Sequence, residues 1–432
     1  MKYLLMLIFP AMLFLSCNDD DESTPAPLGK ASRTVLIYMA GENNLTASNG
    51  YRFLNLDIAE IIEGSKSLSD DQRLLVFVDS LNTNSRQAGK PFIMEVHGGT
   101  ATKVHEFDSE FYSCDPSRFK EVLQWMYTNA PADSYGLSLW GHATGWIVSN
   151  DTIAQAEART STRAYGQDYG SDGGSQNKKW LNITQMARVL EGFPKMEFIF
   201  ADCCNMMCVE VGYELLSVTN YLIGSPAEIP GFGAPYNQII PYFYKNDSEL
   251  YKGIIDTYYN YYYDDYQTDY ELQGSSLPLS VIDTKYISNL ATITHDILSR
   301  FIGGYPKYPN YPNLKGMGFY WYYDVPIMYD MRQFIKNNTT DADFQQWDKV
   351  YQQAVPHYRM SLEWMSIYDF LTLSFDSFDQ DPALYGCVSM FIPLHKKTYY
   401  TGEFRYNYTF NNFKWNRVLD WERFGWTSDI TY

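Results

Sequence analysis

The sequence of 432 residues is short of basic side chains, and this shortage narrows the classes of partner. Lys and Arg number 33 against 51 Asp and Glu, so the net charge is −18. A chain this acidic lacks the phosphate-binding surface of nucleic-acid-binding proteins, so we expect no nucleic acid partner. The charge also disfavours attachment to an anionic membrane through a basic face. It suits basic substrates, although surface acidity often serves only solubility.

Cysteine is also scarce. Of the six Cys, Cys17 lies in the leader described below. The other five are Cys114, Cys203, Cys204, Cys208 and Cys387, of which residues 203, 204 and 208 lie close together. An odd number in this spacing does not form a disulfide framework. Zinc would need a C-x-x-C pair or a nearby His, and the Cys cluster has neither. We therefore expect no zinc centre, and the sequence also lacks a Gly-rich phosphate loop and a Ser nucleophile elbow.

No apolar run is long enough to span a bilayer, and residues 1–17 predict an export signal instead. Lys2 gives a short positive start, and the apolar run 3–15 is too short for a stable membrane span. Residues 13–17, LFLSC, resemble a bacterial lipobox, in which cleavage before Cys17 would leave Cys17 to carry the lipid. The alternative is an ordinary secretory signal in which Cys17 is incidental.

The residues after Cys17 indicate the destination. Residues 18–22, NDDDE, resemble the acidic tag that sends lipoproteins of Bacteroides-type bacteria to the outer face of the outer membrane. Residues 18–32 contain this tag and a flexible stalk with two Pro. We therefore expect an exported protein at the cell surface that touches the membrane only through its lipid anchor.

The rest of the chain alternates short apolar strands with helical patterns. We expect buried strands at 34–40, 74–79, 135–140, 197–201, 221–224 and 279–283, helices at 55–64, 116–129 and 182–192, and a hairpin at 92–107. Asp115 followed by Pro116 is a typical helix start. Such strands predict an α/β fold whose mostly parallel sheet is covered on both faces. We place the main domain at 33–300 and an added aromatic-rich α/β region, with a strand at 388–392, at 301–432.

Two segments depart from this pattern. Residues 149–180 are polar and rich in Gly and Ser, which predicts a long exposed loop that carries Arg159, Arg163, Lys178 and Lys179. Residues 258–266 are a run of Tyr and Asp on an expected helix, and we expect this run on the surface.

Reactive side chains follow two of the expected strands, where sites gather in open parallel sheets. One strand ends in WGHATGW, which contains His142, and the next ends in DCCN, which contains Cys203 and Cys204. A Cys that starts the helix expected at 206–215 would gain thiolate character, and a neighbouring His would complete a nucleophile and acid/base pair. The alternative is that the cysteines are small buried hydrophobes and His142 is a turn residue.

The remaining histidines are weaker candidates. His97 and His105 lie on the expected hairpin, His295 lies on a helix, and His357 and His395 lie in segments expected at the surface. We interpret each of them as structural or exposed.

Four ordered motifs resemble the clostripain family of cysteine peptidases. They are TVLIYMAGENNL at 34–45, LWGHATGW at 139–146, DCCNM with EVGYEL at 202–215, and IPGFGAPY at 229–236. The resemblance extends from about residue 33 to residue 394. Alignment on the EVGYEL segment places Cys204, rather than Cys203, on the family's nucleophile.

The resemblance implies a caspase-like three-layer α/β/α sandwich and an endopeptidase that cleaves after Arg or Lys through a dyad of Cys204 and His142. It implies an oxyanion hole made by the backbone N–H groups of Cys204 and Ala143. Ala143 replaces the usual Gly, Asn205 replaces Leu and Cys203 replaces Ala; the Ala keeps its N–H, so we expect the hole to survive.

The resemblance also implies further properties of the enzyme. Relatives can cut themselves between the catalytic His and Cys, where Arg159, Arg163, Lys178 and Lys179 are candidate sites; the alternative is a plain solvated loop. Some relatives require calcium. We expect no obligatory cofactor, and calcium stays open because the many acidic residues single out no ligand set.

Asp202 is the candidate specificity residue. A carboxylate facing the thiol would raise its pKa, so Asp202 is a poor activator and is better placed in the substrate pocket. There it would pair with an Arg or Lys side chain of the substrate, as the resemblance also implies. The alternative is an Asp that caps backbone N–H groups at a helix start.

For the whole protein, two hypotheses remain. The first is a monomeric surface-tethered cysteine endopeptidase whose partners are proteins or peptides with basic residues. The second is a non-catalytic lipoprotein on the same fold that binds peptide or glycan through its 38 Tyr. The pair of Cys204 and His142 favours the enzyme.

Overall fold

The computed structural model has a nine-stranded central sheet in the order β13-β10-β9-β8-β5-β1-β2-β3-β4. The structure describes residues 28–46, 52–82, 87–147, 164–170, 178–265, 277–301, 314, 316–323, 325–360, 363–365, 372–374, 382–392 and 413–421. The strands of this sheet are β1 (Ala31–Gly41), β2 (Gln72–Ser80), β3 (Phe92–His97), β4 (Thr100–Glu106), β5 (Ala132–Trp140), β8 (Met196–Asp202), β9 (Thr219–Gly224), β10 (Leu279–Asp283) and β13 (His357–Arg359).

The centre of the sheet is parallel and its edges are antiparallel. Strands β2, β1, β5, β8 and β9 run parallel to one another. The hairpin β3–β4 extends one edge, and β10 and β13 extend the other, all in antiparallel pairing. The carboxyl ends of five strands therefore meet at one edge of the sheet, which is where parallel sheets place their sites.

Two hydrophobic cores flank the sheet, as the side-chain alternation of strands requires. In β1, Leu36 and Tyr38 face one core, and Val35 and Ile37 face the other. The first core is covered by α2 (Pro116–Asn129), α3 (Ile183–Leu190), α4 (Val209–Glu214) and α7 (Thr284–Phe301). The second is covered by α1 (Phe53–Gly64), α5 (Tyr236–Ile239) and α6 (Asp247–Asn260). The α/β fold with a sheet covered on both faces is confirmed.

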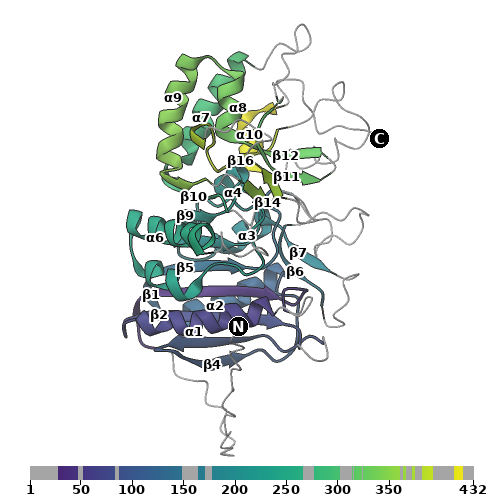
Figure 1. The fold of residues 1–432 in the computed structure, drawn as a ribbon. Helices are drawn as coiled ribbons and strands as arrows, with labels where there is room; N and C mark the ends of the chain where they lie inside the picture. The colour runs from purple at the N-terminus through teal and green to yellow at the C-terminus, as the bar shows by residue number, and fades with distance from the viewer. Residues whose placement is uncertain are drawn as a thin grey trace, which may run out of the picture.

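The C-terminal region adds smaller elements at the top of the view in Figure 1. Helix α9 packs against α7 and α8. The elements are α8 (Met331–Asn338), α9 (Asp341–Ala354), α10 (Lys414–Leu419), the three-stranded sheet β11 (Phe319–Tyr323), β12 (Val325–Asp330) and β16 (Ser389–Met390), and the pair β14 (Glu363–Met365) and β15 (Thr372–Ser374). Because β13 completes the edge of the main sheet, this region is continuous with it.

Short helical turns complete the description: η1 (Ser65–Ser67), η3 (Ile240–Tyr244), the π-helical turn η4 (Tyr261–Asp265) and η6 (Pro382–Leu384). No helix in the described ranges is both long enough and apolar enough to cross a membrane. The predicted signal, Cys17 and most of the stalk lie outside the described residues.

The prediction of an exposed loop at 149–180 is wrong for its described parts. Strands β6 (Tyr165–Asp168) and β7 (Lys179–Leu181) pair antiparallel, and all of β6 is buried. The polar composition of the segment concealed this pair, in which Tyr165 and Leu181 belong to the first core and Trp180 is buried. Residues 148–163 and 171–177 lie outside the described residues.

The tyrosine run at 258–266 is also not simply a surface feature. Tyr258, Tyr259 and Tyr262 are buried against the sheet, because α6 carries its apolar stripe onto that face and the π-helical turn continues it. Residue 266 lies outside the described part.

Candidate active site

Cys204 and His142 each lie two residues beyond the last paired residues of two adjacent parallel strands. Trp140 of β5 pairs with Asp202 of β8, so each reactive residue stands two positions beyond the same rung of the sheet. The strands are parallel, and both chains leave the sheet at the same edge. The predicted pair is therefore brought to one place by the register alone.

Accessibility separates these two residues from their neighbours. In residues 141–147 His142 alone is not buried, and in residues 201–210 Cys204 alone is not buried. Cys203 and Cys208 are fully buried, and burial raises the pKa of both thiols. All five described cysteines are free. Among them, Cys204 is the one that is half-buried rather than buried, which supports Cys204 over Cys203 as the candidate nucleophile.

His142 is held by a residue that the sequence argument did not single out. Its Nε2 lies 2.8 Å from Oδ1 of Asn44, in the turn after β1. Its backbone carbonyl accepts the N–H of Gly166 in β6 at 2.9 Å. With Asn44 Oδ1 as acceptor, Nε2 carries the proton and Nδ1 is left as the basic nitrogen. Asn44 is the last residue but one of the motif at 34–45, and an amide placed there was the available signal.

The backbone around Cys204 forms a turn and not the start of a helix, so the expected helix at 206–215 is wrong at its beginning. Helix α4 begins at Val209. Asn205 has φ +59, and the N–H groups of Asn205 and Met207 bond to the carbonyls of Ala227 and Ser225. These bonds tie the segment to the loop after β9. Thiolate stabilisation by a helix N-terminus therefore does not apply directly to Cys204, whose Sγ instead accepts the N–H of Ile229 at 3.5 Å.

Gly145 lets the two reactive segments pack together. Its φ is +59, and a Cβ at this position would stand 2.6 Å from the Sγ of Cys208 and closer still to the carbonyl oxygen of Asn205. Distances this short do not occur between real atoms, so only Gly fits. The conformation of the His segment is thereby coupled to that of the Cys segment.

The hydrogen bonds on either side of Ala143 determine the direction in which its backbone N–H points. The N–H of Thr144 donates to Ala164, and the carbonyl of His142 accepts from Gly166, so Ala143 and Tyr165 form a bridge without bonding each other directly. In this pattern the N–H of the bridged residue points to the opposite side of the strand. The N–H of Ala143 therefore points away from β6, as an oxyanion donor there would need to.

Asp202 is buried and sits in a polar network. Its Oδ1 accepts from the hydroxyl of Tyr258 at 3.0 Å, and its Oδ2 accepts from the N–H of Ala234 at 3.2 Å. Burial raises its pKa to about 6 despite these hydrogen bonds. It therefore does accept a backbone N–H, but from the loop before α5 and not from the helix after Cys204.

More acidic groups adjoin Asp202. Asp57 of α1 accepts from the indole of Trp140 at 2.5 Å, and burial, followed by the charge of Asp202, raises its pKa. A Cβ at Gly233, where φ is +64, would lie 3.0 Å from Asp202 Oδ2 and 3.1 Å from Asp57 Oδ2. The carboxyl groups of Asp202 and Asp57 therefore both lie next to Gly233, which has no side chain. Neither Asp57 nor Tyr258 was among the site residues expected from the sequence.

Of the four candidate self-cleavage residues, the structure describes two. Lys178 and Lys179 are half-buried at the start of β7. Arg159 and Arg163 lie outside the described residues, as do Cys17 and His395.

The other described histidines lie on separate elements. His97 and His105 are on β3 and β4, and His295 is on α7. His357 is half-buried on β13, where its Nε2 lies 2.9 Å from an oxygen of Asp256, so it is not a surface residue.

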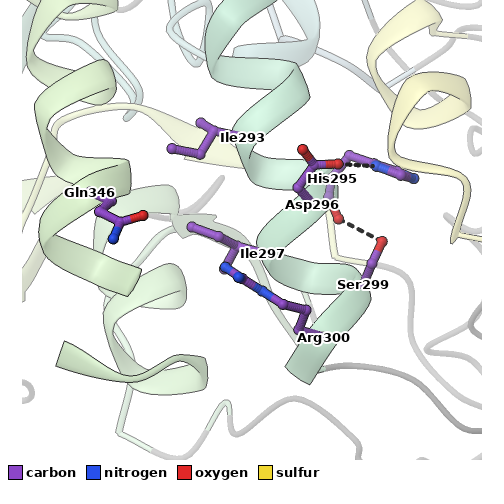
Figure 2. A pocket seen from close by; sticks show the side chains of 7 residues that line it. All are labelled: Ile293, His295, Asp296, Ile297, Ser299, Arg300 and Gln346. Carbon is purple, nitrogen blue, oxygen red and sulfur yellow. Dashed lines mark hydrogen bonds and ion pairs between the residues drawn. The ribbon is translucent and has the colours of Figure 1, made fainter. Parts of the chain in front are cut away.

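A hollow of about 500 Å³ lies away from the strand ends, on α7 and α9 (Figure 2). It is lined by Ile293, His295, Asp296, Ile297, Ser299, Arg300 and Gln346. His295 is engaged by its neighbour Asp296 at 3.1 Å. No lining residue comes from β5 or β8, so we do not assign the hollow to the reactive pair.

Comparison with known proteins identifies the family. A family model described as the clostripain family matches residues 37–426. The chain belongs to the clostripain family of cysteine peptidases.

Solved structures agree with this assignment. A secreted C11 cysteine protease from Bacteroides thetaiotaomicron, in complex with an irreversible peptide inhibitor, is 25% identical with a TM-score of 0.71, over 91% of this chain and 99% of that one. An inactive zymogen C11 protease from Parabacteroides distasonis shares the fold at 20% identity and a TM-score of 0.68, over the same shares of the two chains. A search of curated proteins finds no match. The clostripain-family chain is therefore a cysteine peptidase, and the non-catalytic hypothesis is set aside.

Two glutamates of the clostripain-family motif EVGYEL have a structural role. Oε1 of Glu210 accepts the N–H of Phe391 at 2.7 Å, and Oε2 of Glu214 accepts the N–H of Lys414 at 3.2 Å. Both carboxyl groups thus fasten C-terminal segments to α4, which follows Cys204 in the chain. Burial raises the pKa of Glu210 to about 8.

One group of side chains could hold a cation. Within the described residues, the carboxyl groups of Glu42, Asp79 and Asp168 each offer an oxygen within 4.8 Å of the others. The abundance of acidic residues concealed this set in the sequence.

Proposed function

We propose that the chain is an endopeptidase that cleaves peptide bonds after Arg or Lys through Cys204 and His142. The observation that carries the proposal is that the accessible residues of two adjacent, otherwise buried strand-end segments are a Cys and a His. Because a binding module has no need of this pair, its isolation at the carboxyl edge of the sheet favours catalysis.

The chemistry follows from the two side chains. His142 takes the thiol proton of Cys204, and the sulfur attacks the scissile carbonyl carbon while the N–H groups of Cys204 and Ala143 stabilise the oxyanion. His142 gives a proton to the leaving amine, and the acyl group remains on sulfur as a thioester. Water, deprotonated by His142, then releases the acid product and restores the thiol. Asn44 keeps the imidazole in one tautomer throughout.

Asp202 is the proposed determinant of specificity. A buried carboxyl group whose pKa is about 6 is mostly ionised at neutral pH, although burial penalises its charge. A guanidinium or ammonium group of the substrate would offset that penalty. Asp57 stands beside it, and burial followed by the charge of Asp202 raises the pKa of Asp57, so a cationic side chain would also favour the ionised form of this second carboxyl group. Bidentate pairing would favour Arg over Lys.

The proposal extends to location and processing. We propose lipidation at Cys17 and anchorage to the outer face of the outer membrane, on the basis of the leader and its acidic tag. Solved structures with a similar fold include a secreted protease and an inactive zymogen, which fits export and activation. We propose self-cleavage between His142 and Cys204, at Arg159, Arg163, Lys178 or Lys179; an intact wild-type chain after prolonged active incubation would contradict it.

The test uses the purified chain without its leader and a matched set of peptide amides that differ only in the residue before the scissile bond. We expect cleavage of the arginyl and lysyl amides and little cleavage of norleucyl or glutamyl amides. Cleavage of all four at similar rates would contradict the proposed specificity while leaving the peptidase activity intact.

A further inference from the structure

A short C-terminal segment lies against the chain that follows the candidate nucleophile. This segment is residues 389–391, which we refer to as the strap; it begins with β16 and is buried throughout. The N–H of Ser389 donates to the carbonyl of Met207 at 2.9 Å, and Ser389 forms a parallel bridge with Cys208. The strap is therefore paired with the segment that starts at Cys204.

The strap also contacts the segment that carries His142. The ring of Phe391 packs edge-on against the ring of Trp146, with 4.8 Å between the ring centroids. Trp146 is buried and ends the WGHATGW motif, which contains His142. Just before it, Gly145 leaves no room for a side chain against the sulfur of Cys208. The strap thus contacts both reactive segments where they pack on each other.

Glu210 of α4 holds the strap in this position. Glu210 is 0% exposed, and its Oε1 accepts the N–H of Phe391 at 2.7 Å. Burial raises the pKa of Glu210 to about 8, so at neutral pH the carboxyl group is mostly protonated and keeps a carbonyl oxygen for this N–H. A neutral acceptor is therefore sufficient at this position, and Gln supplies one whereas Ala does not.

Glu214 on the same helix makes a similar bond to a different segment. Its Oε2 accepts the N–H of Lys414 at 3.2 Å, and its side chain is 5% exposed. Lys414 begins α10, which packs on α4 and α7. The two glutamates therefore allow release of the strap to be compared with release of another C-terminal segment.

We propose that Glu210 is a positioning residue for the reactive pair of Cys204 and His142. Its hydrogen bond holds the strap on Trp146, and the strap fixes the two reactive segments against each other. The proposal rests on the proposed function of the pair and adds the C-terminal region to the assembly that turnover requires. Because a misplacement of about 1 Å between reacting groups can cost on the order of 10²-fold in rate, release of the strap should lower kcat.

The test measures turnover of the peptide amide that the wild type cleaves fastest, at a temperature at which melting curves show each variant folded. We expect Glu210→Ala to lower kcat by roughly 10- to 100-fold and to change KM by less than about twofold. Glu210→Gln should recover most of kcat, because its amide oxygen still accepts the N–H of Phe391. The matched control Glu214→Ala should lower the melting temperature and keep kcat.

Three results of this test would overturn the proposal. They are an unchanged kcat in folded Glu210→Ala, an equal loss of kcat in Glu214→Ala, and no recovery in Glu210→Gln. If Glu210→Ala does not fold, Phe391→Leu decides, since it keeps the N–H bond to Glu210 and removes the ring that contacts Trp146. We expect it to lower kcat, whereas Phe243→Leu, the same change in the second core, should not. Unchanged kcat in folded Phe391→Leu would also contradict the positioning role.

Alkylation of Cys204 by iodoacetamide, located by mass spectrometry, separates failure of this proposal from failure of the proposed function. An imidazole beside the thiol allows alkylation at about pH 6, where an ordinary thiol with a pKa of about 8.5 is nearly inert. We expect this reactivity in the wild type, and in Glu210→Ala we expect alkylation to begin at higher pH. If wild-type Cys204 reacts as an ordinary thiol and no amide is cleaved, the proposed function fails. If the wild type is reactive and Glu210→Ala has the same pH profile, the positioning role alone fails.

Discussion

Replacement of Asp202 by Asn removes one charge from the proposed pocket and keeps the shape of the side chain. Burial holds the pKa of Asp202 at about 6, some two units above its ordinary value of 3.8. That shift corresponds to about 3 kcal/mol spent on ionising the buried group. A cationic substrate side chain that neutralises it would recover a similar amount. We therefore expect Asp202→Asn to lower kcat/KM for arginyl amides by roughly 10²-fold or more.

The direction in which Asp202→Asn changes the melting temperature distinguishes a role in substrate binding from a role in capping backbone N–H groups. A raised carboxyl pKa means that the wild-type chain loses stability as pH rises from about 4 through about 6. Asn avoids that loss, so Asp202→Asn should melt at or above the wild-type temperature at pH 7. A role limited to binding the N–H of Ala234 would instead lower the melting temperature.

The assay compares arginyl and norleucyl amides between pH 5 and 8, with a melting curve for each variant. For wild type, kcat/KM on the arginyl amide should fall more steeply below pH 6 than on the norleucyl amide. Tyr258→Phe is the matched control, because it removes a hydrogen bond to Asp202 and keeps the charge. Its preference for Arg should persist. Undiminished Arg preference in folded Asp202→Asn would refute the reasoning.

Three further predictions concern the fold and the leader. Because burial raises the pKa of Glu210 to about 8, the wild-type chain should lose up to about 3 kcal/mol between pH 5 and 8, and urea unfolding of Glu210→Gln should show a smaller loss. Gly145→Ala should cost about 2 kcal/mol or more and most of kcat, whereas the exposed control Gly29→Ala should change neither; unchanged turnover in Gly145→Ala would show that the two segments move independently. Mass spectrometry of the mature amino terminus should find an acylated Cys17, and a soluble chain that begins elsewhere would contradict lipidation.

The strands were predictable because local signals decide them. The continuous apolar runs at 34–40 and 135–140 fit only buried strands, and Asp115 with Pro116 fixed the start of α2, where the Asp115 side chain accepts the N–H of Ser117 at 2.8 Å. The edge strand β13 was not predictable, since its three half-buried residues have no pattern of their own and follow β10 through tertiary contact.

The residues of the candidate site also fall into those that the sequence could predict and those that it could not. Cys204 and His142 were predictable from their place after adjacent strands. Asp57 and Tyr258 were not, because each reaches the site through tertiary packing that no local spacing reveals. Asn44 lies within the motif at 34–45, but its contact with His142 is also tertiary. The helix expected at 206–215 began too early because the amides of Asn205 and Met207 bond to the loop after β9 instead. Propensity favours a helix there, and long-range hydrogen bonds override it.

Cys204, and not the adjacent Cys203, is the proposed nucleophile because Cys204 is half-buried whereas Cys203 is fully buried. The most direct measurement is turnover of an arginyl amide by Cys204→Ala and by Cys203→Ala, each checked for folding by its melting curve. We expect Cys204→Ala to be inactive and Cys203→Ala, which changes a fully buried thiol, to keep most of the activity. Activity in Cys204→Ala together with its loss in folded Cys203→Ala would show that Cys204 is not the nucleophile.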